Sequence, residues 1–169
     1  GCTMIQKLPN ADPLTGFPAV TRFRFDFRTL EPVSLPAYSG SAWRGLLGHG
    51  LRRTVCVTRQ KCCDGCLLEG SCVYSTFYES PARGTRVTGR GKAAPHPFVL
   101  SLPAEGPRRF ETGTSLWLGI SLIGPAQNTL PYLIHALSIA GERGIGKGQG
   151  RFRLIGVEAE QVLGSREWQ

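Results

Sequence analysis

Cysteines supply the clearest metal-binding chemistry in the sequence. Five of the six lie between positions 56 and 72, and four of them follow the pattern C-x6-C-x2-C-x5-C: Cys56, Cys63, Cys66 and Cys72. Zinc takes four soft ligands in a tetrahedron, and a C-x2-C pair presents two thiolates from one tight turn. The spacing predicts a structural zinc site, with an iron–sulfur cluster as the less favoured alternative because it also takes four thiolates. Cys62 lies close enough to replace one neighbouring ligand.

A glycine-rich segment over residues 141–153 has the composition of a phosphate-binding loop. It contains five glycines, which let backbone N–H groups approach a phosphate, and four basic residues: Arg143, Lys147, Arg151 and Arg153. The segment follows a helical pattern, whereas a Walker loop or a dinucleotide fingerprint precedes its helix. We therefore expect contacts with RNA phosphates, and a plain helix-to-strand hairpin is the alternative.

The whole chain is basic, with 20 Lys and Arg against 12 Asp and Glu, a formal charge of +8 and a pI near 9.6. Such a surface attracts polyanions, and nucleic acid is the commonest of them. Further candidate RNA-binding residues lie on an alternating segment, on the predicted helix at 42–56 and in the polar stretch 81–97: Arg22, Arg24, Arg52, Arg86, Arg90 and Lys92. A solvated loop is the alternative for the polar stretch.

His49 could perform acid–base chemistry beside basic groups. Arg52 and Arg53 follow it at one-turn spacing on the predicted helix, and Tyr38 lies just ahead of that helix. A histidine can take the proton of an RNA 2′-hydroxyl or protonate the leaving 5′-oxygen, while nearby cations stabilise the charged phosphorane. Chemistry alone favours the simpler alternative, which is an ordinary surface histidine that contacts the RNA backbone.

Hydrophobic periodicity predicts the elements that position these residues. Phenylalanines alternate with charged residues along a strand at 22–28, and an apolar stripe with helical spacing runs over 42–56. Two further strands, a helix that begins near Pro131 and a last strand follow at 97–102, 115–123, 131–141 and 151–157. The order β-α-β-β-α-β predicts an α+β, ferredoxin-like (RRM-like) antiparallel sheet with the cysteine knuckle inserted after the first helix.

One domain accounts for this pattern. We expect an arm at 1–19, the RNA-handling domain at 20–158 with the knuckle insertion at 56–72, and a tail at 159–169 that could link to a second domain. No apolar run reaches the roughly 20 residues that a membrane span needs. The sequence therefore predicts a cytoplasmic protein with no membrane contact and with reduced cysteines.

Several segments together resemble a known family. They are Leu35–Arg53, the segment from the knuckle to Glu79, Pro95–Leu100, Leu130–Leu137 and the glycine-rich Gly144–Leu154. In this order they resemble the CRISPR repeat-RNA-processing endoribonucleases of the RAMP superfamily, over roughly residues 20–158. The resemblance implies a ferredoxin-like domain that cleaves CRISPR repeat RNA without a metal and leaves a cyclic phosphate.

The resemblance also assigns roles to residues. It places the catalytic histidine at His49, with Tyr38 and Arg53 as helpers by analogy. Members of the family usually carry two such domains, whereas this chain has room for one. Two alternatives follow: a RAMP-type subunit that binds RNA beside other CRISPR effector subunits without cutting, and a zinc-stabilised protein-interaction module.

Overall fold

A four-stranded antiparallel sheet forms the centre of the protein. The computed structural model describes residues 19–68, 71–78, 97–103, 108–161 and 164–169. The strands lie in the order β3-β5-β1-β6, and their bounds are β1 Val20–Thr29, β3 Phe98–Ser101, β5 Ser115–Ile123 and β6 Phe152–Ala159. Every neighbouring pair is antiparallel, so β1 and β5 form the middle of the sheet.

The alternation in β1 separates the two faces of the sheet. Phe25 and Phe27 are fully buried on one face, whereas Arg22 and Arg28 are exposed on the other. Successive side chains of a strand point to opposite faces, so this one segment fixes which face carries the core. The strand predicted from residues 22–28 is confirmed and extends a little at each end.

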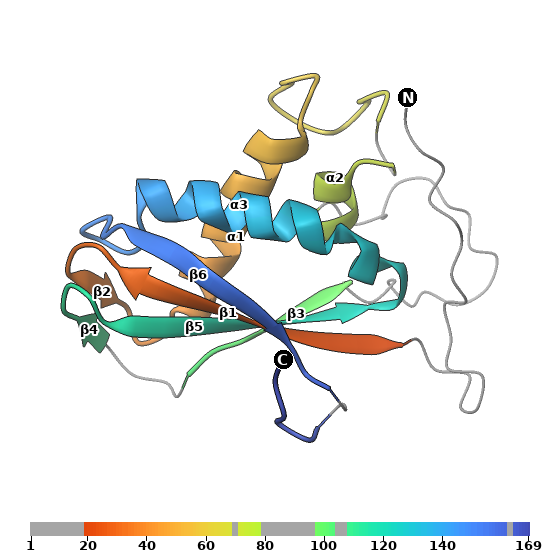
Figure 1. Cartoon of the computed structure of the whole chain (residues 1–169). Coiled ribbons are helices and arrows are strands. Elements are labelled where there is room, and N and C mark those ends of the chain that lie inside the picture. Colours follow the sequence, from red (N-terminus) through yellow and green to blue (C-terminus); the bar gives the residue numbers. More distant parts are fainter. Residues whose placement is uncertain (1–18, 69–70, 79–96, 104–107, 162–163) are drawn as a thin grey trace.

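Two helices cover the apolar face. Helix α1 (Gly40–Val55) follows β1, and α3 (Leu130–Arg143) follows β5 through a 3-10 turn, η1 (Gly124–Thr129). Figure 1 shows both helices on the same side of the sheet. Trp43 and Leu47 of α1 and Leu133 and Leu137 of α3 are buried beneath them. The mixed α+β class and the four-stranded antiparallel sheet predicted from the sequence are therefore confirmed.

Three short elements lie outside this pattern and were not predicted from the sequence. Strand β2 (Val33–Leu35) pairs with β4 (Arg108–Phe110) as a second sheet, and α2 (Val73–Tyr78) packs beside α1. A strand of three residues is too short to show a period. Val33 nevertheless forms part of the core and is fully buried.

The C-terminal segment folds back on the sheet. Glu160 forms a bridge with Trp168, and the Ala159 and Gln169 backbones exchange two hydrogen bonds, at 2.7 and 3.0 Å. The described part of the tail predicted at 159–169 thus forms a hairpin at the end of β6. Nearly all of the arm predicted at 1–19 lies outside the described residues.

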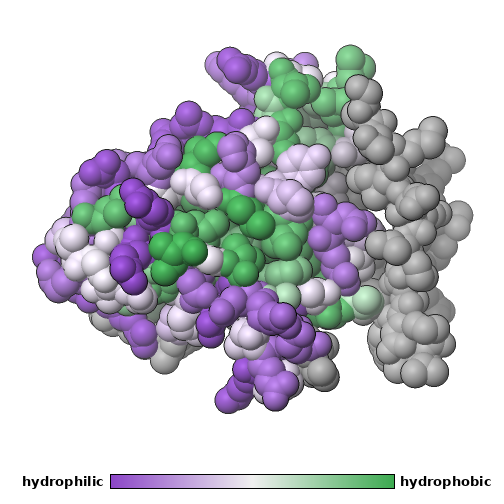
Figure 2. All heavy atoms as spheres, viewed as in Figure 1, coloured by the Kyte–Doolittle hydropathy of each residue, from purple (hydrophilic) through white to green (hydrophobic). Residues whose placement is uncertain are grey.

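Apolar side chains also reach the surface. Figure 2 shows them gathered where β6, an edge strand, runs beside α3. Ile155 is 52% exposed there, next to the partly buried Leu154 and Val157. Among the described residues, no helix is both long and apolar enough to cross a membrane.

Candidate functional site

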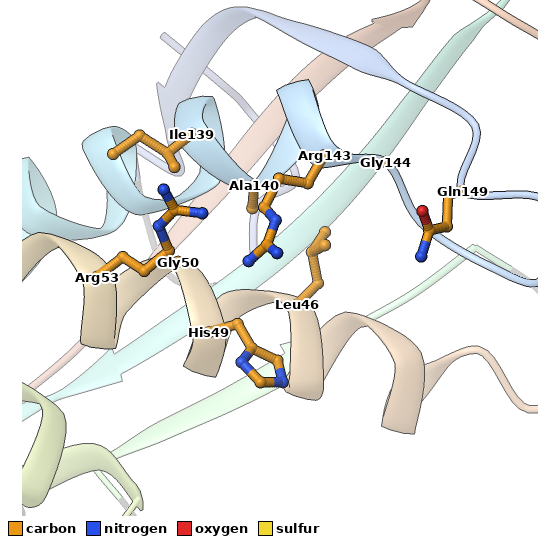
Figure 3. A pocket seen from close by; sticks show the side chains of 9 residues that line it. All are labelled: Leu46, His49, Gly50, Arg53, Ile139, Ala140, Arg143, Gly144 and Gln149. Carbon is orange, nitrogen blue, oxygen red and sulfur yellow. The ribbon is translucent and has the colours of Figure 1, made fainter. Parts of the chain in front are cut away.

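A hollow of about 280 Å3 lies between α1 and the C-terminal end of α3. It collects residues from three parts of the chain: Leu46, His49, Gly50 and Arg53 from α1, Ile139, Ala140 and Arg143 from α3, and Gly144 and Gln149 from the segment that follows. In Figure 3 the guanidinium groups of Arg53 and Arg143 extend from opposite helices into the gap between them, and the His49 ring lies at the α1 edge. Three of the predicted site residues therefore share one cavity.

A glycine contact brings the two helices together at this point. A Cβ added to Gly50 would lie 2.4 Å from the Ala136 backbone oxygen and 3.3 Å from the Ala140 Cβ. Only glycine permits that approach, so the backbones of α1 and α3 touch beneath the hollow. His49 and Arg53 lie on either side of Gly50 in the sequence, and the contact sets their position relative to α3.

The hollow is suited to an anion. His49, Arg53 and Arg143 are all exposed, and no carboxylate is among the described residues that line it. Arg53 and Arg143 lie in the last turns of their helices, where a cation also offsets the partial negative charge of the helix end. A phosphate group in the hollow would meet no acid among the described residues that line it.

The structure does not bring Tyr38 or Arg52 to this site. Tyr38 is 77% exposed in the turn before α1, and its distance of eleven positions from His49 corresponds to about 16 Å at the helical rise. The Arg52 side chain donates hydrogen bonds to the backbone oxygens of Gln60 and Lys61, the second at 2.7 Å, and lies over the Tyr74 ring. Arg52 thus holds the cysteine segment against α1.

Glycines of the segment 141–153 approach the chain's own backbone. A Cβ at Gly146, whose φ is +77°, would lie 2.1 Å from the Ser34 oxygen, and one at Gly150 would lie 2.5 Å from the Pro32 oxygen. Ile145 and Gly150 form a bridge, which makes the segment a hairpin packed on β2. These two glycines therefore serve packing, which agrees with the hairpin alternative, while Lys147 is exposed on the turn between them.

Three of the other predicted RNA-binding residues have acidic partners. Arg151 forms an ion pair with Glu31 at 2.9 Å, and its side-chain and backbone hydrogen bonds lower the pKa of that carboxyl from its ordinary value. Arg24 pairs with Glu158 on the outer face of the sheet.

Arg22 pairs with Glu160 at 3.7 Å on the same face, which is opposite to α1 and α3. Arg153 is exposed on that face too, directly across from Arg28. None of the arginines on this face can share a ligand with His49 at the hollow. The remaining candidates, Arg86, Arg90 and Lys92, lie outside the described residues.

The cysteine segment lines one small pocket with all its sulfur-bearing residues: Cys56, Cys62, Cys63, Cys66 and Cys72. The Cys66 N–H donates to the Cys63 oxygen at 3.0 Å, and Gly65 has a φ of +72°, so this C-x2-C is a tight turn as the spacing predicts. Within the described ranges, however, no three His, Cys, Asp or Glu side chains lie close enough together to hold a metal ion. The donor chemistry fits zinc, but the four-cysteine knuckle itself is not assembled.

Sequence reasoning missed two sets of residues. Gln149 lines the hollow from a turn where its φ is +48°, and no sequence pattern marks it. Glu160 and Trp168 line a second hollow on the outer face of the sheet, within the segment that the sequence predicts to be a tail. The aromatic and acidic composition of that tail was the available signal.

Comparisons with known proteins identify the family of this domain. An uncharacterized protein of Archaeoglobus fulgidus is 26% identical over 123 residues, which make up 73% of this chain and 40% of that protein. The chain therefore matches less than half the length of this relative. The model of the family AF_1859_N, which is described as an N-terminal domain, matches residues 17–168. This match takes in every described strand and helix, and the chain accordingly belongs to the AF_1859_N family of N-terminal domains.

Proposed function

We propose that this domain binds CRISPR repeat RNA at the hollow between α1 and α3 and cleaves it without a metal. The observation that carries the proposal is the convergence of His49, Arg53 and Arg143 on one cavity whose described lining has no acid. The resemblance to the RAMP superfamily endoribonucleases supplies the substrate class. The basic net charge of +8 favours a polyanionic ligand independently of that resemblance.

We also propose that the domain is of the ferredoxin-like (RRM-like) type. The strand order β3-β5-β1-β6, with α1 following β1 and α3 following β5, supports the split β-α-β arrangement of that fold.

The chemistry requires few groups from the protein because RNA supplies its own nucleophile. His49 takes the proton of a 2′-hydroxyl, the freed oxygen attacks the adjacent phosphorus, and the bond from phosphorus to the 5′-oxygen breaks. A cyclic phosphate and a 5′-hydroxyl result, the latter after it gains a proton from the imidazolium or from water. Arg53 and Arg143 stabilise the charge that develops on the phosphorane oxygens.

One observation favours the second candidate, an RNA-binding subunit that does not cut. His49 is the only side chain in the described lining of a type that commonly acts as a general acid or base, and Tyr38 lies away from the hollow. A single histidine is enough to anchor a phosphate, whereas efficient cleavage usually divides the acid and base roles between two groups.

A cleavage assay in chelator separates the two candidates. The protein is incubated with an all-ribose repeat hairpin and, in separate reactions, with a series of hairpins that each carry one 2′-deoxy nucleotide at a different position. The endoribonuclease proposal expects cleavage that survives the chelator and that one deoxy substitution abolishes. Tight binding without any cleavage of the all-ribose hairpin would decide for the binding subunit.

We also propose that the cysteine segment binds one structural zinc. Cys56, Cys63, Cys66 and Cys72 would hold the ion, and their place in the lining of one pocket supports this assignment. Desolvation acts to raise the pKa of the Cys56 thiol, but hydrogen bonds from its neighbours outweigh it, and the pKa lies below its ordinary value. Elemental analysis should give about one zinc per chain. A folded Cys63→Ser/Cys66→Ser variant that melts at the wild-type temperature would refute the site.

A further inference from the structure

A second and larger hollow lies on the outer face of the sheet, opposite to the helices. Its volume is about 390 Å3, and its walls come from the middle of β1 and β5 and from the C-terminal hairpin. Trp117 of β5 and Trp168 of the hairpin both line it. Nothing in the proposed cleavage at His49 uses this cavity.

Glu160 places an unsatisfied acceptor in the wall of this hollow. Its side chain is only 1% exposed, and its Oε1 accepts the backbone N–H of Arg166 at 2.9 Å. Its Oε2 has no hydrogen-bond donor among the described residues, although the Arg22 Nη1 lies 3.7 Å away. A buried carboxylate oxygen in this state is stabilised by any ligand that brings an N–H group to it.

The rest of the lining suits a flat ring. Trp117 is 36% exposed, and the Arg24 guanidinium lies 5.4 Å from the centre of the Trp168 ring. A side chain at Gly119 would narrow the floor, because its Cβ would lie 3.0 Å from the Ser101 Cβ and 3.5 Å from the Trp117 ring. Exposed aromatic rings beside arginines are the usual platform for unpaired bases.

We propose that this hollow binds one unpaired guanine base of the RNA. The inference rests on the proposed function only in taking RNA as the ligand class. Guanine presents its O6 acceptor beside its N1–H and N2–H donors, which matches the Arg22 donor beside the Glu160 acceptor. Adenine and cytosine would instead aim a ring nitrogen lone pair at the carboxylate, and uracil would offer one donor and a smaller ring to stack.

A pair of arginines on the same face can hold the adjoining backbone. Arg28 of β1 and Arg153 of β6 lie directly opposite each other and are both exposed. Neither has an acidic partner within the part of the chain that the structure describes, and two like charges in this position repel unless an anion lies between them. They are four residues, or about 13 Å, along the strand from Arg24, a span that a short single strand of RNA covers.

Base selectivity tests the proposal on the intact chain. Labelled pentaribonucleotides with one variable base between cytidines are titrated by fluorescence anisotropy. We expect central guanine to bind most tightly, then uracil, with adenine and cytosine at least about fivefold weaker, since a bidentate base contact gives roughly 5- to 150-fold discrimination. Equal affinity for all four pentamers would overturn the proposal.

Variants tie that selectivity to the hollow. Glu160→Gln should remove the guanine preference, whereas the matched control Glu111→Gln, on an exposed acid that pairs with Arg109, should retain it. Trp117→Ala should weaken binding of every pentamer, and this readout stands even where Glu160→Gln fails to fold. Unchanged affinity in Trp117→Ala, or an unchanged guanine preference in folded Glu160→Gln, would place the base elsewhere.

The test also separates this proposal from the proposed function. The double variant Arg53→Ala/Arg143→Ala removes both arginines from the hollow between α1 and α3. It should leave the preference of the protein for the guanine pentamer intact. Selectivity that disappears in this double variant would assign the base contact to the other hollow and overturn the proposal. Cleavage of repeat hairpins can succeed or fail without any effect on these pentamer affinities.

Discussion

The hollow between α1 and α3 and the outer face of the sheet are both rich in arginine, but the two surfaces differ in whether their arginines are paired with acids. In the hollow, Arg53 and Arg143 face a described lining that contains no acid. On the outer face, Arg22 and Arg24 are paired with Glu160 and Glu158. A basic residue that the fold pairs with an acid offers less charge to a phosphate, so charge counted along the sequence overestimates the phosphate-binding surface.

Distance along the chain explains why the difference is hidden in the sequence. The acid that pairs with Arg24 lies 134 residues away, and the one that pairs with Arg151 lies 120 residues away. Arg53 and Arg143 also come from helices far apart in the sequence, yet they line one hollow whose described lining has no acid. The comparison therefore depends on tertiary contacts, and four experiments can test it.

Removal of the His49 imidazole should have the largest effect. Loss of one proton-transfer group typically lowers a cleavage rate by about 10² to 10⁴. His49→Ala should therefore slow repeat-RNA cleavage by that factor while RNA affinity stays near wild type, as measured by single-turnover cleavage and by anisotropy. His135→Ala is the control, because His135 is exposed on α3 and outside the hollow. Equal rates in the two variants would remove His49 from the mechanism.

Widening of the contact between α1 and α3 should have the second-largest effect. The methyl group of Gly50→Ala would meet the Ala136 oxygen at 2.4 Å, and overpacking of this kind costs about 1–3 kcal/mol. The control is Gly45→Ala on the exposed side of the same helix, where no atom lies within 4 Å and alanine should stabilise by about 0.5–1 kcal/mol. Thermal unfolding should lower the melting temperature of the first variant and raise that of the second. Equal shifts would mean that α1 and α3 do not touch at Gly50.

Deletion of charge from the hollow should weaken RNA binding more than deletion elsewhere. Arg53→Ala/Arg143→Ala should reduce the slope of log affinity against log salt by about one for each phosphate that the variant no longer binds. Arg109→Ala removes an arginine that pairs with Glu111 at 3.0 Å, and the slope should hardly change. The contrast between the two surfaces fails if Arg109→Ala changes the slope as much as the double variant.

Release of a paired arginine should give the smallest effect. Glu31→Gln frees Arg151, so the salt slope of RNA binding should become steeper by about one if Arg151 then meets a phosphate. Arg151 lowers the pKa of Glu31, so the folded protein keeps this carboxylate charged below its ordinary pKa. The stability from the pair is complete above the ordinary pKa and is lost as the pH falls through the lowered one. Wild type should therefore keep a shallower slope than the variant from pH 7 down to the ordinary pKa of 4.5, and approach the variant only in stronger acid. Equal slopes for wild type and variant at pH 7 would contradict this.

Local periodicity predicted the elements well and the site in part. The phenylalanine alternation located β1, and the apolar stripe located α1, because each pattern reports a buried face within a few residues. The same helical spacing put His49 and Arg53 on one side of α1. It could not bring Arg143 to them, since that depends on the contact between Gly50 and Ala136.

Predictions from spacing were wrong where residues that are close in the sequence are not close in the structure. Tyr38 precedes the helix that carries His49, and their separation of eleven positions corresponds to about 16 Å at the helical rise. Arg52 turns toward the cysteine segment instead. The glycines at 146 and 150 look like a phosphate cradle by composition, yet they pack against β2. A strand of three residues carries no period, so no pattern in the sequence could reveal that packing partner.

The central place of β1 determines when the domain can form during synthesis. Its neighbours in the sheet, β5 and β6, begin 95 and 132 positions after its first residue, Val20. Long-range pairing of this kind slows folding, because a large loop must close before the contacts that stabilise it are made. At roughly 5–20 residues per second, the first strand waits for several seconds on the ribosome with its phenylalanines unpaired. Fragments that stop before β6 should therefore not fold.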